Sequence, residues 1–296
     1  MAVDLSTPDV DPVTVAIRVS VPERGFRQDL RAVRIVWYRE LIRFKSDRLR
    51  FVTSLVQPVL FLFVLGTGLG QLAGAGLPSG ISFKTFVYPG VLAMSVLFTA
   101  IFSAASIVWD REFGFLREML VAPVSRSAIV IGKCLGGATV ATFQGIIILA
   151  LAGAAHVPYD PILFLTVIGE LLLLSFTLTA FGVMMAARIK QMQAFMALTQ
   201  MLVMPLFFLS GALYPLNGLP AWLGVLTRFD PLTYIVSPMR YAVFSHLSVS
   251  PAAMSFLAPN VTWDGWQVPI GLSLGIVAVM GAVLLGVAIA EFQKTE

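Results

Sequence analysis

The chain has 296 residues, of which 58% are hydrophobic and 12% are charged, and its formal net charge is +4. Soluble domains are about 45–50% apolar and about 25% charged, so this composition excludes an ordinary soluble domain and predicts a membrane protein. The chain has a single cysteine, Cys134, which excludes a disulfide within the chain.

The first predicted element is a basic amphipathic helix over residues 26–51. It follows residues 1–25, which lack the apolar segment of a signal peptide and are predicted to be a flexible cytoplasmic tail. One face of the predicted helix carries apolar side chains spaced three and four residues apart, namely Leu30, Val33, Trp37, Leu41 and Phe44. Such a helix lies in the membrane interface, and its cations attract anionic lipid. A plain anchor and a helix that also contacts a partner protein both fit this pattern.

Six apolar runs reach the roughly 20 residues that a helix needs to cross a bilayer. They are residues 52–70, 86–109, 128–153, 162–187, 195–214 and 268–290. Of the 20 Lys and Arg residues, only Lys84, Arg228 and Arg240 fall on the second side of the membrane. Because basic residues stay cytoplasmic, both termini are predicted to be cytoplasmic, with residues 52–290 as one transmembrane domain and residues 291–296 as a tail. The same topology explains the basic composition without nucleic acid.

A densely charged segment separates the second and third runs. Residues 108–127 read VWDREFGFLREMLVAPVSRS. Phe113, Leu116 and Leu120 share one helix face, and Pro123 disfavours helix at the residue before it. The sequence therefore predicts a short helix near residues 110–121. Mixed charge favours docking on a protein surface, where complementary charges set the register.

Residues 215–239 are too interrupted to cross a membrane and too apolar for an exposed loop. The interruptions are Pro215, Gly218, Pro220, Pro231 and Pro238. Half-inserted, re-entrant helices with aromatic residues at headgroup depth fit this pattern. The alternative is an exposed loop, which leaves a large apolar patch in water.

Polar residues inside the apolar runs are few. Glu170 is costly in a membrane and must face protein, water or the interface; it either lines a substrate path or lies near the outer surface. Gln144 and Gln200 are interpreted as hydrogen-bonding groups between helices. Small residues in the third run allow close helix packing: Gly132, Gly136, Gly137, Ala138 and Ala141.

No catalytic or metal-binding pattern is evident in the sequence. The two histidines, His156 and His246, are isolated. The Gly132-Lys133 pair lacks the G-x-x-x-x-G-K-[ST] spacing that cradles nucleotide phosphates. The prediction is therefore that this chain is not an enzyme, and that it holds no metal and no cofactor.

Two segments carry a resemblance to a known family. DREFGFLREMLVAPVSRSAIVIGK (110–133) resembles the segment after the second span of ABC-2 type permeases, especially the daunorubicin-resistance and nodulation exporters. LSGALYPLNGLPAWLGVLTRFDPLTYIVSPMR (209–240) resembles the segment after the fifth span of that family. The resemblance extends over about residues 30–290.

The resemblance implies a membrane subunit of an ABC exporter in a prokaryotic inner membrane. Two such permeases, identical or different, pair above two separate ATPase subunits that bind ATP and Mg. The implied coupling helix, which seats on the ATPase, contains Asp110, Arg111, Glu112, Phe113, Gly114, Phe115, Leu116, Arg117 and Glu118. The implied interface helix contains Arg34, Trp37, Arg39, Glu40 and Arg43. A substrate path along the second and fifth spans contains Phe98, Phe102, Gln200, Met201, Met204 and Phe207, and Glu170 is added on its own chemistry.

The family implies an amphipathic cargo, such as a drug, a lipid or a glycolipid, that leaves the cytoplasm or the inner leaflet; drug export would confer antibiotic resistance. A permease for lipid-linked polysaccharide is an alternative. A secondary transporter is a further alternative, but it needs coupling-ion sites near the midplane, often in repeated halves, and the sequence shows no such repeat. A membrane enzyme would need a catalytic cluster that the sequence does not show.

Overall fold

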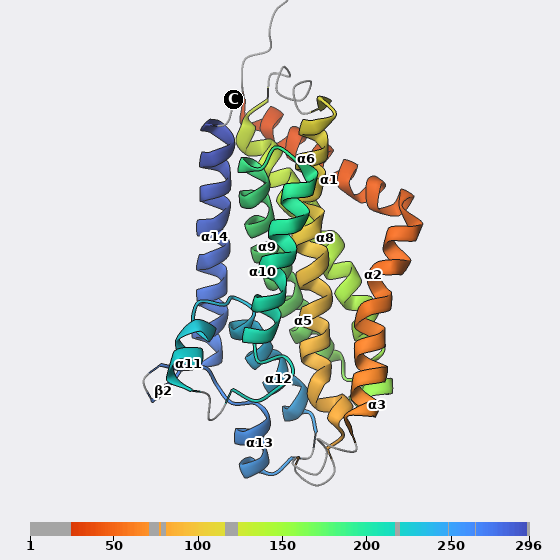
Figure 1. Ribbon diagram of the computed structural model, residues 1–296, viewed down its shortest axis with the longest axis vertical. Helices are drawn as coiled ribbons and strands as arrows, with labels where there is room; N and C mark the ends of the chain where they lie inside the picture. The colour runs from red at the N-terminus through yellow and green to blue at the C-terminus, as the bar shows by residue number, and fades with distance from the viewer. Residues whose placement is uncertain are drawn as a thin grey trace, which may run out of the picture.

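The computed structural model describes residues 25–70, 77, 81–115, 124–216, 220–247, 249–263 and 265–294. Within these ranges it is almost entirely helical, and six helices are long and apolar enough to cross a membrane (Figure 1). The predicted fold class, an all-α protein with six spans, is therefore confirmed. The predicted tail at 1–25 lies outside the described ranges except for its last residue, whereas residues 291–294 of the predicted tail at 291–296 belong to α14, which extends to Lys294.

The six spans agree with the predicted runs to within a few residues at each end. They are Phe51–Gly68 (within α2 Arg48–Leu60, η1 Phe61–Leu65 and α3 Gly66–Gly68), Phe83–Glu112 (α5 Phe83–Ser103 and α6 Ala105–Glu112), α8 Arg126–Leu149, α9 Pro161–Arg188, α10 Met192–Leu209 and α14 Ile270–Lys294. The remaining elements are α1 Phe26–Ser46, η3 Ala152–Ala155, α11 Ala221–Thr227, α12 Thr233–Ser245, α13 Pro251–Leu257, β1 Thr262–Trp263 and β2 Trp266–Gln267.

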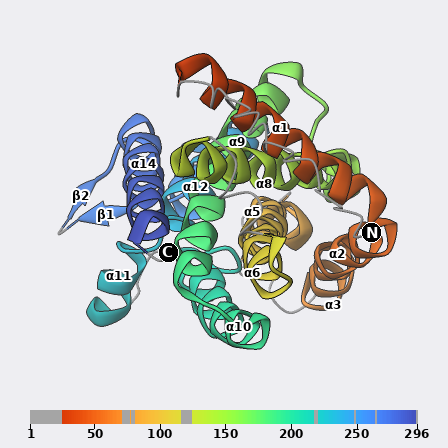
Figure 2. The same cartoon turned by 90° about the horizontal axis from the view of Figure 1, so that it is seen from above.

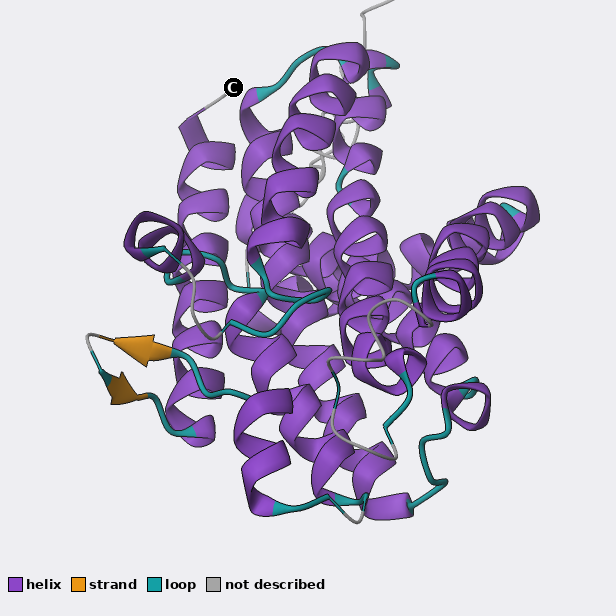
Figure 3. Ribbon diagram, turned by 60° about the horizontal axis from the view of Figure 1, so that its bottom comes forward, coloured by secondary structure: helices purple, strands orange, loops and turns teal. Residues whose placement is uncertain are grey.

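The molecule has two distinct ends (Figure 1). At one end, α1 lies across the bundle near the last turn of α14; we call this the α1 end. Toward the other end lie α11, α12 and α13, and we call this the α13 end. The hairpin of β1 and β2, which pair antiparallel, projects beside α14 there (Figure 3).

The second, third and fourth spans form the centre of the bundle. In the most apolar window of each span, 78% of residues are buried in α5–α6, 67% in α8 and 50% in α9, against 17% in the first span and 22% in both α10 and α14. Seen from above, α5 and α6 lie in the middle while α1 crosses the outer side of α8 (Figure 2). The three outer spans therefore leave most of their apolar surface for lipid or for another protein.

The second span has a break at Ala104. There the backbone N–H of Ala104 donates to Ile101 O (3.2 Å) and that of Ile107 donates to Ala104 O (3.0 Å), so bonds reach back three residues instead of four. The break lies against Gly182 of α9, where an added Cβ would lie 3.0 Å from the Cβ of Ala104. A glycine at this point lets the two helices touch.

The predicted amphipathic helix is shorter than expected. α1 ends at Ser46, and the remaining residues to 51 already belong to the start of α2. The face of α1 that is buried against the protein consists of Ala32, Val36 and Glu40. The predicted apolar stripe lies beside that face and is partly or fully exposed, which leaves it for the membrane.

Two short helices, α11 and α12, form in and just beyond the segment that was predicted to be re-entrant. Arg240 of α12 is 2% exposed. Its guanidinium donates to the backbone oxygens of Tyr214 (3.1 Å) and Ala212 (2.9 Å) and lies 4.3 Å from the centre of the Phe86 ring. This side chain joins α12 to α5 and to the loop after α10. The depth of these helices in a bilayer stays a prediction.

Candidate functional site

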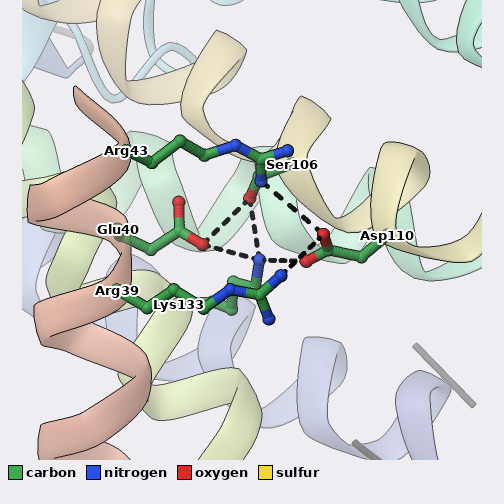
Figure 4. Close-up of polar contacts among 6 residues, drawn as sticks. All are labelled: Arg39, Glu40, Arg43, Ser106, Asp110 and Lys133. Atoms are coloured by element: carbon green, nitrogen blue, oxygen red, sulfur yellow. Dashed lines mark hydrogen bonds and ion pairs between the residues drawn. The ribbon is translucent and has the colours of Figure 1, made fainter. Parts of the chain in front are cut away.

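A buried cluster of charged side chains lies at the α1 end (Figure 4). The ammonium group of Lys133, on α8, donates to Glu40 Oε1 of α1 (2.6 Å), Asp110 Oδ2 of α6 (2.7 Å) and Ser106 Oγ (3.0 Å). Arg39 and Arg43 approach Asp110 Oδ1 at 3.4 and 3.6 Å. We call these six residues the charge cluster: Arg39, Glu40, Arg43, Ser106, Asp110 and Lys133.

The charge cluster is stable only as a complete set. Lys133, Asp110 and Glu40 are 4%, 1% and 8% exposed, and a charge taken out of water is costly unless it is paired and hydrogen-bonded. Here one ammonium group meets two carboxylates, and the two guanidinium groups offset the second of them. Removal of one member of such a buried set typically costs about 3–5 kcal/mol, because its partner is left uncompensated.

Two glycines of α8 bring α1 close enough for these contacts. An added Cβ at Gly132 would lie 2.8 Å from the Cβ of Val36, and one at Gly136 would lie 2.6 Å from the Cβ of Glu40. Lys133 follows the first of these glycines directly. The predicted role of small residues in the third span is thus confirmed at the point where α1 crosses α8.

The two residues after Asp110 attach α6 to two further spans. Arg111 donates to the carbonyl oxygens of Ala186 (3.0 Å), Ala187 (3.1 Å) and Ile189 (2.7 Å) at the end of α9. Glu112 Oε2 accepts from the backbone N–H of Met192 (3.4 Å), the first residue of α10. A cation at a helix C-terminus and an anion at a helix N-terminus both suit the helix dipole.

Three consecutive residues, Asp110, Arg111 and Glu112, therefore join the end of α6 to α1, α8, α9 and α10. We call this triplet the α6 anchor. It belongs to the last turn of the second span and not to a separate helix, because the structure extends that span to Glu112.

The chain after the α6 anchor turns toward the surface. Gly114 has a positive φ of 82°, a conformation that favours glycine. Phe113 and Phe115 are 71% and 51% exposed. The expected start of a separate helix at residue 110 was wrong, because α6 continues to Glu112 and the chain turns at Gly114. Leu116, Arg117 and Glu118 lie outside the described residues, so the rest of the helix expected over 110–121 stays a prediction.

The predicted substrate-path residues fall into separate places. Phe98 and Phe102 stack with ring centres 6.3 Å apart and line a cavity of about 360 Å³ between α1, α2, α5 and α8. Gln200, Met201 and Met204 lie on the exposed face of α10, whereas Phe207 is buried against Phe61 of the first span. Glu170 is 5% exposed, and its Oε2 has no hydrogen-bond partner within the described residues.

A neutral network closes one wall of that cavity. Gln144 Oε1 accepts from Ser54 Oγ (3.0 Å) and Thr99 Oγ1 (2.6 Å), and its Nε2 donates to Ser54 O (3.1 Å). Gln144 thus joins α8 to α2 and α5, which confirms its predicted role between helices. Ser54, Thr99 and the roles of Lys133 and Ser106 were not anticipated, since their partners lie far away in the sequence.

Comparison with known proteins gives a consistent result. The family model for the ABC-2 type transporter matches residues 31–244. The inner membrane transport permease YadH of Escherichia coli is 29% identical over 213 residues, covering 71% of this chain and 82% of its own length. Nodulation protein J of Rhizobium leguminosarum is 28% identical over 214 residues, covering 69% and 79%.

A third relative, the "Probable multidrug ABC transporter permease YbhR" of Escherichia coli, is 32% identical over 157 residues, covering 52% of this chain and 42% of its own length. YadH and YbhR are named as permeases, and YadH is named as an inner membrane protein. The family match covers more than half of the chain and includes the charge cluster and the α6 anchor. The chain therefore belongs to the ABC-2 type transporter family, as a multi-pass permease of the inner membrane.

Proposed function

We propose that this chain is the membrane subunit of an ABC exporter and that the turn after the α6 anchor receives the movement of a separate ATPase subunit. The observation that carries the proposal is the set of contacts made by Asp110, Arg111 and Glu112, which reach four other elements. A displacement of the following turn would pass to α1, α8, α9 and α10 together.

Two exposed aromatic side chains support docking at this turn. Phe113 and Phe115 present large apolar groups at the α1 end, and aromatic residues of this kind form the centres of protein interfaces. Most of the basic residues that the structure describes lie at the same end, which supports a cytoplasmic location for it. ATP and Mg would be bound by two ATPase subunits there, and not by this chain.

The exposed face of α10 supports pairing with a second permease. Gln200 carries an amide on that face, next to Met201 and Met204. An amide that faces lipid has no hydrogen-bond partner, so a spanning helix normally places it against protein or a polar path. In a pair of permeases, this face would line the route of the cargo, and flexible methionines suit varied apolar molecules.

The cargo that fits best is an amphipathic drug, lipid or glycolipid moved outward. The name of YbhR refers to multidrug transport, and polar groups are scarce in the spans. A lipid-linked polysaccharide remains the alternative within the family. The buried carboxylate of Glu170, whose Oε2 has no hydrogen-bond partner among the residues that the structure describes, is the observation that favours a proton-coupled secondary transporter. In that case Glu170→Gln would abolish transport that persists without ATP.

Site-directed cross-linking tests the docking turn. In a Cys134→Ser background, Phe113→Cys and Phe115→Cys should each cross-link in intact cells to a protein that carries a nucleotide-binding motif. Trp222→Cys is the matched control, because Trp222 is 66% exposed in α11 at the other end. The proposal fails if the three variants give the same adducts, or if no ATPase is captured by either phenylalanine position.

A further inference from the structure

A groove runs along the side of α1 that carries Leu30, Val33 and Trp37, where α1 crosses α8, with a volume of about 550 Å³. Its rim carries three guanidinium groups, those of Arg27, Arg31 and Arg34. Its floor is apolar and is formed by Leu30 and Val33 of α1 and by Leu135 of α8. Trp37 and Thr139 close one end, where the indole Nε1 donates to Thr139 Oγ1 (3.1 Å).

The charged residues that line this groove are all positive. None of the residues that line it is acidic, and the three arginines are exposed. At positions i, i+4 and i+7 they share one side of the helix. Asp29, the acidic residue nearest in sequence, accepts from the backbone N–H of Ser125 (3.0 Å). Within the part of the chain that the structure describes, no acidic side chain pairs with these arginines, so the rim is a field of positive charge.

The apolar floor is as informative as the charge. Leu30 and Leu135 are 60% and 39% exposed, so some apolar molecule must cover them in the membrane. Leu135 is nine residues after Arg126, the first residue of α8, which at 1.5 Å per residue is about 14 Å along the helix. A ligand that fills the groove needs a negative group at the rim and a hydrocarbon chain that continues toward Leu135.

We propose that this groove binds an anionic phospholipid of the cytoplasmic leaflet, with its phosphate on the three arginines and an acyl chain along Leu135. Guanidinium groups bind phosphate oxygens through paired hydrogen bonds, and basic groups beside a membrane attract anionic lipid. A resident lipid fits better than transported cargo because the groove shares no lining residue with the cavity at Phe98 and Phe102.

The bound lipid would hold α1 in place from the side opposite the charge cluster. On one side, Val36 and Glu40 pack against the glycines of α8. On the other, the phosphate would bridge arginines of successive helical turns and the chain would fill the space between α1 and Leu135. This site is separate from the docking turn, so it stands or falls independently of the proposed ATPase coupling.

Quenching of Trp37 fluorescence tests the site. The full chain is reconstituted into phosphatidylcholine nanodiscs containing a small fraction of phosphatidylglycerol with brominated acyl chains, or of phosphatidylcholine with the same brominated chains. The signal of Trp37 is obtained as the difference between the wild type and Trp37→Phe. Brominated phosphatidylglycerol should quench it at a lower membrane fraction than brominated phosphatidylcholine does.

The variant Arg27→Gln, Arg31→Gln, Arg34→Gln should remove this preference. A basic residue beside an anionic surface contributes about fivefold in affinity, so we expect about a 100-fold loss for three. The matched control is Arg188→Gln, Lys190→Gln, Lys294→Gln, which removes three exposed cations from the same end of the molecule and should keep the preference. The triple Arg→Lys variant keeps the charge, and it should retain most of the preference.

Three outcomes would overturn the proposal. One is equal quenching by the two lipids. Another is an unchanged preference in the triple Gln variant that still elutes as a folded protein. The third is a triple Gln variant that keeps the lipid preference but no longer co-purifies with an ATPase, which would assign the arginines to a protein partner.

Discussion

The buried cations Lys133 and Arg240, at opposite ends of the molecule, are held by different chemistry, although the partly buried Arg111 at the α1 end also donates to backbone oxygens. At the α1 end, Lys133 binds two carboxylates from two other helices. At the α13 end, the buried cation is Arg240, and it binds backbone oxygens and the face of an aromatic ring. Carbonyl groups of a folded backbone are fixed, whereas side-chain ion pairs can exchange partners. The difference suits the proposed transfer of movement at the α1 end and a fixed shape at the α13 end.

The largest expected effect comes from breaking the charge cluster. Lys133→Met leaves Glu40 and Asp110 without their shared cation, and such a loss costs about 3–5 kcal/mol. We expect a large drop in the melting temperature of the purified protein in detergent. The double variant Glu40→Gln, Lys133→Met should recover part of the loss, because a buried carboxylate is removed with its partner. Equal melting temperatures of wild type and Lys133→Met would contradict the role of the cluster.

The second-largest effect is expected at Arg240, in the α13 end. Arg240→Lys keeps the charge but offers a compact ammonium group in place of the planar fork, so it cannot reproduce both backbone contacts and the ring contact. Loss of a hydrogen bond to a charged group is worth about 1.5–3 kcal/mol. Thermal melting should show a smaller loss than that of Lys133→Met. Limited proteolysis should show faster cleavage between residues 210 and 240.

A third prediction concerns pH at the α13 end. Asp230 lies outside the six spans, and its burial raises the pKa of its carboxyl group to about 8, although hydrogen bonds from Leu232 N–H and the Thr233 hydroxyl act in the opposite direction. The carboxyl group of an unfolded chain titrates near about 4. The folded state therefore keeps a proton that the unfolded state loses, and stability falls as pH rises from about 4 to about 8, by up to about 1.4 kcal/mol per pH unit.

Asp230→Asn should flatten this dependence in melting curves from pH 5 to pH 8, because an amide keeps the acceptor oxygen without titrating. Asp160→Asn is the control. Hydrogen bonds from the backbone of Leu163 and Ile162 lower the pKa of Asp160, so it contributes stability above the unfolded pKa that is lost only at more acidic pH. A wild-type curve that does not decline between pH 5 and pH 8 would contradict the prediction.

The smallest expected effect comes from an exposed ion pair. It tests whether the large effect expected at Lys133 depends on burial of the charge. Arg188 forms two hydrogen bonds with Glu291 (2.9 and 2.8 Å) at the α1 end, but its side chain is 71% exposed. Exposed pairs contribute about 0–1 kcal/mol. Arg188→Gln should therefore melt within a few degrees of the wild type. A loss as large as that of Lys133→Met would show that charge at this end matters regardless of burial.

Much of the fold follows from hydrophobic runs and from the distribution of basic residues. The six spans, the amphipathic α1 and the interrupted segment after α10 are local patterns, and the structure contains an element at each of them. α13 and the β1–β2 hairpin were not predicted, because two-residue strands leave no periodic signal. α1 ends at Ser46, earlier than the expected residue 51, and the sequence does not indicate this end because the segment KSDRLRF (45–51) contains neither the glycine nor the proline that marks most helix ends.

The contacts of the site were much harder to predict. The sequence predicts no partner for Lys133, because one sequence gives no sign that Glu40, 93 residues away, binds it. Asp110 was placed on a docking surface by resemblance, yet its side chain is buried. Only the small residues around Lys133 hinted at a close crossing. They indicate that a helix approaches α8, but not which one.

The break at Ala104 divides the second span into α5 and α6, and α6 can tilt there relative to α5. From Ala105 to Glu112 the segment has eight residues, which is about 12 Å of helix. A tilt of about 10° at the break would carry its tip sideways by about 2 Å, while α5 stays packed in the centre of the bundle. That distance exceeds the tolerance of the Glu112–Met192 hydrogen bond. A small rotation around the contact with Gly182 is therefore enough to break the hydrogen bond that joins Glu112 to α10, and the reverse rotation is enough to re-form it.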